Sequence, residues 1–217
     1  TSHTRTTCAI KEVSVMAVIN ISPYCSAGHS QFYTNEALGI KGLTNECLLK
    51  AMKSCYQFEN INMYEHGVMV HEAYLQLIDL LESGMILEGL PEELIDVYQI
   101  NKDNLFDIPC MKFYQTYHDC GKPYCKTVDE DGKQHFPNHA QVSYNKFKEV
   151  FPYEEAEQML ILHDMDFHTL KPDELKELAN SEYGFSLYLT AWAELIANSS
   201  MFGGFDRYNK DGFITQV

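Results

Sequence analysis

From residue 43 onward the apolar residues follow a helical spacing, and this pattern constrains the fold more than any other feature. Its clearest example is the stretch 63–82, where one helical face would carry His66, Val70, Ala73, Tyr74, Leu77 and Leu81. Side chains three and four positions apart lie on the same side of an α-helix. The same spacing, often with a proline near its start, predicts further helices near 109–119, 137–151, 152–168, 171–180 and 183–200. We therefore expect an all-α bundle of about six to eight helices.

The first 42 residues lack this period. Residues 9–21 are rich in β-branched side chains and are compatible with one strand or a docked extended segment, whereas residues 22–42 contain glycines and turn formers. We predict an irregular N-terminal arm or lid over 1–42, followed by one helical domain over 43–217.

The charge of the chain bears on its partners. The 217 residues carry 31 acidic and 16 basic side chains, a formal net charge of −15. Such a surface repels phosphate backbones at long range, which argues against broad coating of nucleic acid. A local positive pocket would still act within a Debye length of about 10 Å. A small anionic substrate fits this balance better than a long duplex.

The cysteines and the lengths of the apolar runs bear on where in the cell the protein is expected. Seven cysteines form an odd set without a CxxC pair, so we expect reduced thiols and a cytoplasmic protein rather than a disulfide framework or a zinc ribbon. No apolar run approaches the roughly 20 residues of a membrane span, and the first residues do not resemble a secretory signal.

One stretch carries most of the chemical information, residues 117–139, which read YHDCGKPYCKTVDEDGKQHFPNH. The adjacent pair His118–Asp119 offers an imidazole and a carboxylate, both metal ligands. Lys122 follows three residues later and supplies a point charge that suits phosphate. His139 lies twenty residues after Asp119. Together these residues indicate a metal-dependent enzyme that acts on phosphate esters.

Further polar residues fall on faces predicted to point inward. His66, His163 and Glu194 each share a helical face with apolar residues. A single histidine on such a face is more often a hydrogen-bonded core residue than a ligand. Several polar groups from different helices that converge on one core are how helical bundles build metal sites. His71 lies about 140° round the helix from His66, so we interpret it as a surface histidine or one that supports a ligand. The histidines that we expect to be structural or exposed are His3, His29 and His168.

The order of these residues resembles the HD-domain superfamily of metal-dependent phosphohydrolases. The resemblance spans roughly residues 60–200 and includes the segment HDCGKP at 118–123. The extension VDEDGKQHFPNH at 128–139 is similar to the HD domain appended to bacterial tRNA nucleotidyltransferases. Nothing in the chain resembles the nucleotidyltransferase catalytic domain.

The resemblance implies roles for individual residues. One metal ion would be held by His66, His118, Asp119 and Glu194. Asp119 could bridge to a second ion held by His139 and His163, with Asp164 nearby, and Lys122 would contact a phosphate oxygen. The nitrogen and oxygen donors favour Mn²⁺, Fe²⁺, Co²⁺ or Ni²⁺ over Mg²⁺ or zinc.

The chain departs from the family pattern at two places. Glu194 stands where the family usually has an aspartate, and His163–Asp164 stands where many two-metal members carry paired histidines.

The substrate and the class of function stay open at this point. The nucleotidyltransferase-like extension favours a 2′,3′-cyclic or terminal phosphate on RNA, and the acidic surface favours a free nucleotide. An HD-fold sensor or interaction protein without catalysis is an alternative. An iron-dependent oxygenase is another, kept open by His163–Asp164 and Asp166.

Overall fold

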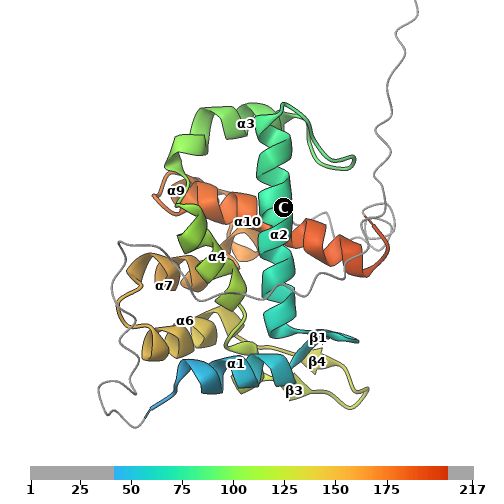
Figure 1. The fold of residues 1–217 in the computed structure, drawn as a ribbon, viewed down its shortest axis with the longest axis vertical. Coiled ribbons are helices and arrows are strands. Elements are labelled where there is room, and N and C mark those ends of the chain that lie inside the picture. The colour runs from blue at the N-terminus through green and yellow to red at the C-terminus, as the bar shows by residue number, and fades with distance from the viewer. Residues whose placement is uncertain (1–41, 205–217) are drawn as a thin grey trace, which may run out of the picture. The chain divides into compact units, whose positions relative to one another are not determined.

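The predicted all-α class is confirmed by a computed structural model, which describes residues 42–204 (Figure 1). The described part contains eight helices of eight or more residues: α1 Asn45–Ser54, α2 Met63–Glu82, α3 Glu93–Asn101, α4 Ile108–Tyr117, α6 His139–Val150, α7 Glu155–Leu162, α9 Pro172–Ala179 and α10 Gly184–Met201. The short helices are α5 Lys122–Cys125, α8 Asp166–Thr169 and the 3₁₀ turn Lys102–Asn104. Apart from residue 42, the predicted arm lies outside the described residues.

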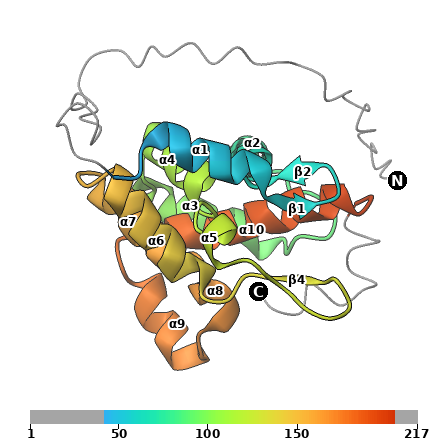
Figure 2. The same ribbon diagram turned by 90° about the horizontal axis from the view of Figure 1, so that it is seen from below.

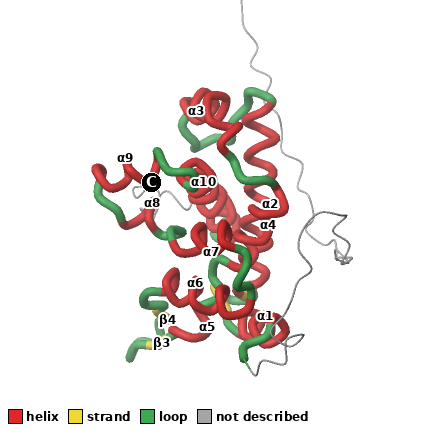
Figure 3. The backbone as a smooth tube through the Cα atoms, turned by 90° about the vertical axis from the view of Figure 1, so that its left-hand side faces the viewer, coloured by secondary structure: helices red, strands yellow, loops and turns green. Residues whose placement is uncertain are grey.

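Helix α2 occupies the centre of this arrangement (Figure 1). It begins at a capping box, in which Asn62 accepts from the Glu65 amide and Glu65 accepts from the Asn62 amide. Its apolar face packs against α4 and α10. Helices α8 and α9 lie on α10 in turn (Figure 3). The predicted helix over 63–82 therefore forms the support on which the other elements are arranged.

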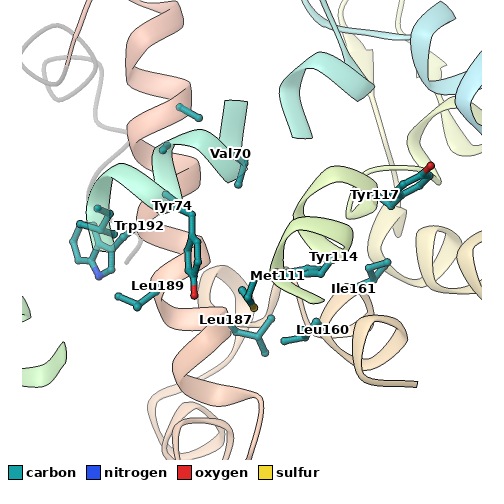
Figure 4. Close-up of a cluster of buried hydrophobic side chains, with 14 of the residues drawn as sticks. Val70, Tyr74, Met111, Tyr114, Tyr117, Leu160, Ile161, Leu187, Leu189 and Trp192 are labelled. Carbon is teal, nitrogen blue, oxygen red and sulfur yellow. The ribbon is translucent and has the colours of Figure 1, made fainter. Parts of the chain in front are cut away.

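The core lies between α2, α4, α7 and α10 (Figure 4). Tyr74, Met111, Tyr114 and Leu160 are fully buried there. Each such side chain stabilises the fold by about 1.5–3 kcal/mol relative to an exposed position. Because this core fixes the axes of the helices, it also fixes the polar residues that they carry.

Gly67 allows α2 and α4 to approach closely. A Cβ atom at this position would lie 2.5 Å from the backbone oxygen of Thr116, which is closer than packed atoms allow. The absence of a side chain lets the two helices cross here, and the rings of His66 and His118 lie 5.4 Å apart at their centroids.

Gly121 likewise allows a close approach, here between the turn after α4 and helix α6. A Cβ atom on Gly121 would lie 2.2 Å from the backbone nitrogen of Ser143, and the Gly121 amide donates to Ser143 Oγ at 2.9 Å. The turn that carries His118 and Asp119 is thereby held against the first half of α6, which begins at His139.

Two short antiparallel hairpins interrupt the helices, and the helical period did not predict them. The first pairs β1 Tyr56–Phe58 with β2 Ile61–Asn62, and the second pairs β3 Thr127–Val128 with β4 Gln134–His135. They extend from the same end of the helical arrangement (Figure 2). At the tip of the second hairpin, Asp129 accepts from the amides of Asp131 and Lys133.

The helix predicted over 152–168 is two helices. Helix α7 ends at Leu162 and α8 begins at Asp166. His163 and Asp164, between them, have partners that draw them out of a continuous helix: Asp166 for His163, and the hydroxyl of Tyr114 for Asp164. In the described part of the chain no helix is long and apolar enough to cross a membrane.

Candidate metal centre

Asp119 is the centre of the polar cluster. Its Oδ2 lies 2.7 Å from Lys122 Nζ, 3.2 Å from His118 Nε2 and 3.8 Å from His66 Nε2. Its Oδ1 lies 3.8 Å from His139 Nε2. Three imidazoles and one ammonium, from three separate places in the sequence, therefore surround a single buried carboxylate.

Glu194 adds a second carboxylate from helix α10. Its Oε1 lies 2.9 Å from His118 Nε2, which is thus placed between Glu194 and Asp119. One donor atom from each of His66, His118 and Glu194 lies within 4.8 Å of the others. Such a group can surround one cation with nitrogen and oxygen donors.

The orientation of two histidines leaves their Nε2 atoms available. His118 Nδ1 donates to the backbone oxygen of Gln115 at 2.7 Å, and His139 Nδ1 donates to the backbone oxygen of Phe136 at 3.1 Å. A carbonyl oxygen can only accept, so Nδ1 carries the proton on each ring. The lone pair of each neutral ring is then on Nε2, the atom that faces Asp119. Backbone carbonyls fix metal-binding histidines in this way.

Several buried atoms of the cluster have no hydrogen-bond partner within the described residues: His66 Nδ1, His118 Nε2 and both carboxylate oxygens of Asp119. Buried polar atoms of this kind are rare, and a site built for an ion is one recognised reason for them. The residues present therefore fit a divalent transition metal.

An ionised carboxylate, Asp119, lies at the centre of the electrostatics of the cluster. Burial, together with the charge of His118, lowers the pKa of His66 to about 4, so its ring is neutral at pH 7. Burial alone would raise the pKa of Asp119, but Lys122 and His118 outweigh it and hold that pKa well below its usual range. Burial opposes a charge on His118, yet Asp119 and Asp164 raise its pKa well above normal. An ionised Asp119 thus faces a neutral imidazole and groups that carry or attract positive charge.

Asp164 lies at the inner edge of the cluster. It is buried and accepts from the Tyr114 hydroxyl at 2.5 Å. Burial, followed by the charge of Glu194, raises the pKa of Asp164 to about 7. Burial would also raise the pKa of Glu194, but contacts with His118 and His168 lower it. The pKa of Asp164 is therefore raised and that of Glu194 is lowered, so Glu194 is the carboxylate that stays ionised.

The structure does not bring His163 to Asp119. Its Nδ1 lies 2.6 Å from Asp166 Oδ2, its side chain is 32 % exposed, and within the described residues it makes no ion pair with Asp119. His168 lies closer to the cluster, because its Nε2 is 3.8 Å from Glu194 Oε2. His168 was expected to be structural or exposed, and its spacing in the sequence contains no signal for this contact.

Two further residues support the cluster from outside. His71 is buried rather than at the surface, and its Nδ1 lies 2.7 Å from Gln115 Oε1, on the residue whose backbone oxygen holds His118. Gln57 on β1 accepts from Lys122 Nζ at 3.0 Å. No spacing or motif in the chain connects Gln57 with a lysine 65 residues away.

Three members of the cluster are partly exposed, and the others are almost fully buried. The side chains of Asp119, His66 and His118 are at most 2 % exposed. Those of His139, Glu194 and Lys122 are 17 %, 14 % and 10 % exposed. A ligand would therefore reach the buried carboxylate past His139, Glu194 and Lys122.

Comparison with known proteins adds no relative: no family model, no curated protein and no solved structure matches this chain. The geometry of the cluster and the sequence motif are therefore what indicate a function for this chain.

Proposed function

We propose that this chain is a metal-dependent phosphohydrolase that cleaves a phosphate ester of a nucleotide or of an RNA end. The observation that supports it most is the convergence of three imidazoles, two carboxylates and one ammonium on one buried cluster. The resemblance of residues 118–123 and 128–139 to HD-domain phosphohydrolases points to the same reaction.

The residues that would hold a divalent ion are His66, His118, Asp119 and Glu194. His139 faces the other oxygen of Asp119 and is placed to contribute to a second ion. Such a cation lowers the pKa of a bound water and offsets negative charge on phosphoryl oxygens. The mixed donors favour Mn²⁺, Fe²⁺, Co²⁺ or Ni²⁺.

The chain itself supplies positioning and a fixed charge. The Lys122 ammonium lies beside Asp119, and a phosphoryl oxygen that reaches the cluster could bind it. His118 and His139 are held in one orientation by backbone oxygens, so they need no reorganisation when a ligand arrives. Because the inner residues are buried, their charges act in a low dielectric and are stronger than they would be in water.

The substrate that we propose is small. The net charge of −15 disfavours a long nucleic acid, and the extension at 128–139 favours a nucleotide-like phosphate. A 2′,3′-cyclic or terminal RNA phosphate and a free nucleotide are both candidates. The five cysteines in the described part of the chain are free thiols, which supports a reducing, cytoplasmic setting.

The test is a turnover screen. The purified chain is loaded separately with Mn²⁺, Co²⁺, Ni²⁺ and Fe²⁺ and offered mononucleotides, cyclic nucleotides and RNA with 2′,3′-cyclic ends. We expect release of phosphate or opening of the ring with at least one metal, and none with Asp119→Ala. If wild type and Asp119→Ala are equally inactive with every metal, the proposal is wrong. Stoichiometric metal without turnover would indicate a sensor, and oxygen uptake with Fe²⁺ would indicate an oxygenase.

A further inference from the structure

The ammonium group of Lys122 is held from three directions. Its Nζ donates to Gln57 Oε1 at 3.0 Å, lies 2.7 Å from Asp119 Oδ2 and sits 5.4 Å from the centre of the Phe136 ring. Gln57 belongs to β1, and Phe136 directly follows β4. One residue of the first hairpin and the residue that follows the second hairpin therefore both contact this lysine.

The first hairpin is anchored, so the place of Gln57 is defined. The amide of Met63 donates to Cys55 O at 2.9 Å, which closes the hairpin onto the start of α2. The ring centroids of Phe58 and of Phe202, at the end of α10, lie 4.9 Å apart. Gln57, between Tyr56 and Phe58, is half-buried. Its carbonyl is thus presented to Lys122 by a segment tied to α2 and α10.

The side chain of Gln57 is neutral, so it can bind the Lys122 ammonium without neutralising its charge. A lysine side chain is flexible and has many rotamers, so a single position must be imposed by partners. Asp119 already forms an ion pair with the ammonium, at 2.7 Å. Gln57 accepts a second bond from the same ammonium, at 3.0 Å, through a neutral carboxamide. The carboxamide therefore helps to fix the ammonium without adding another negative charge beside it.

We propose that Gln57 is a positioning residue that holds Lys122 beside Asp119 and thereby sets the affinity for the phosphate group of the substrate. This inference rests on the proposed phosphohydrolase function. It gives the first hairpin, which lies outside the HD-like motif, a part in substrate binding.

A double-mutant cycle tests the inference. The variants are Gln57→Leu, Lys122→Met and the double variant, with Gln57→Asn as a shorter amide that cannot reach as far. Gln141→Leu on the exposed side of α6 is the matched control. Affinity for inorganic phosphate is measured by calorimetry on the metal-loaded chain, and KM and kcat are measured on the best ester from the screen. Thermal unfolding of each variant shows whether it is folded.

We expect Gln57→Leu to weaken phosphate binding roughly tenfold, as expected for losing a hydrogen bond to a charged group. KM should rise by a similar factor with a smaller change in kcat, because Lys122 contacts the phosphate before and during the reaction. Gln57→Asn should behave like Gln57→Leu. In the Lys122→Met background, Gln57→Leu should have no further effect.

The outcomes separate the two proposals. If the wild type binds phosphate but Gln57→Leu binds it equally well, or if the two substitutions are additive, the role of Gln57 is overturned while the phosphohydrolase stands. If the wild type neither binds phosphate nor turns over any ester with any metal, both proposals fall.

Discussion

Gln115, three residues before His118, uses both ends of its side-chain amide in the core. Its Oε1 lies 2.7 Å from His71 Nδ1, and its Nε2 donates to Thr190 Oγ1 at 2.9 Å, so it joins α4 to α2 and α10. Gln115→Leu would leave the ring nitrogen of His71 and the hydroxyl of Thr190 without these partners. Each buried unpaired group costs about 1–3 kcal/mol, so we expect a loss of roughly 2–4 kcal/mol in the free energy of unfolding. Urea denaturation measures it.

The control for Gln115→Leu is the same substitution at an exposed glutamine, Gln141. Gln141→Leu removes only a surface bond to Asn145 and should change the free energy of unfolding by less than about 0.5 kcal/mol. Equal losses in the two variants would mean that the buried connection contributes no more than a surface contact.

A second prediction at the residue scale concerns Gly121. A methyl group there would meet the backbone of Ser143, which cannot move aside as the end of a flexible side chain can. We expect Gly121→Ala to destabilise the fold by about 3 kcal/mol or more, at the upper end of overpacking effects. The turn with His118 and Asp119 should be displaced as well.

Gly84→Ala is the comparison for Gly121. Gly84 has a φ of +66°, and no atom lies within 4 Å of the place that a methyl group would take, so only backbone strain of about 1–2 kcal/mol applies. Thermal and urea unfolding of both variants should rank Gly121→Ala as the more severe. The reverse order would contradict the close approach of the turn to α6.

At the scale of elements, the capping box of α2 stabilises the helix that carries His66. Asn62→Ala removes the acceptor for the Glu65 amide and should cost about 0.5–2 kcal/mol. Glu65→Gln keeps an acceptor for the Asn62 amide and should cost much less. Chemical denaturation of the two variants checks the difference. A large loss in Glu65→Gln with none in Asn62→Ala would show that the cap is not the stabilising feature.

The sequence predicts α2 well because its apolar face has an unbroken helical period and its start has a local cap. The same reasoning fails at 152–168, where one helix was expected. There the break depends on Tyr114, which comes from α4 and takes Asp164 as its partner. A contact with a distant helix leaves no trace in local spacing, so tertiary structure overrides the helical preference. The two hairpins were missed for a similar reason, since strands of two or three residues are too short to show an alternating period.

Some residues of the candidate site could be predicted from the sequence, and others could not. His118, Asp119 and Lys122 are neighbours in the sequence, and one turn of chain is enough to predict that they lie together. His163 was expected beside Asp119, but the break after α7 turns it toward Asp166. His168 approaches the site through the packing of α8 on α10, and Gln57 through its hydrogen bond with Lys122. The sequence pattern contains neither contact.

At the scale of the whole molecule, the site joins segments that the chain would otherwise keep apart. His66 comes from α2, His118 and Asp119 from the turn after α4, and Glu194 from α10. A cation bound by all of them exists only in the folded chain, so binding must stabilise folding. At a free concentration of 100 times the dissociation constant the gain is about 2.7 kcal/mol. For a chain of this size, that raises Tm by roughly 5–10 °C.

This gain is measured by thermal unfolding with and without Mn²⁺ or Co²⁺, followed by removal of the metal with a chelator. The shift in Tm should appear in the wild type, reverse with the chelator and vanish in Asp119→Asn, which removes the central charge at nearly constant volume. Asp103→Ala, at an exposed acidic position, should keep the full shift. The comparison is needed because a chain of net charge −15 attracts cations at many surface positions. An equal shift in wild type and Asp119→Asn would place the stabilising cation on that surface and would contradict a metal centre at Asp119.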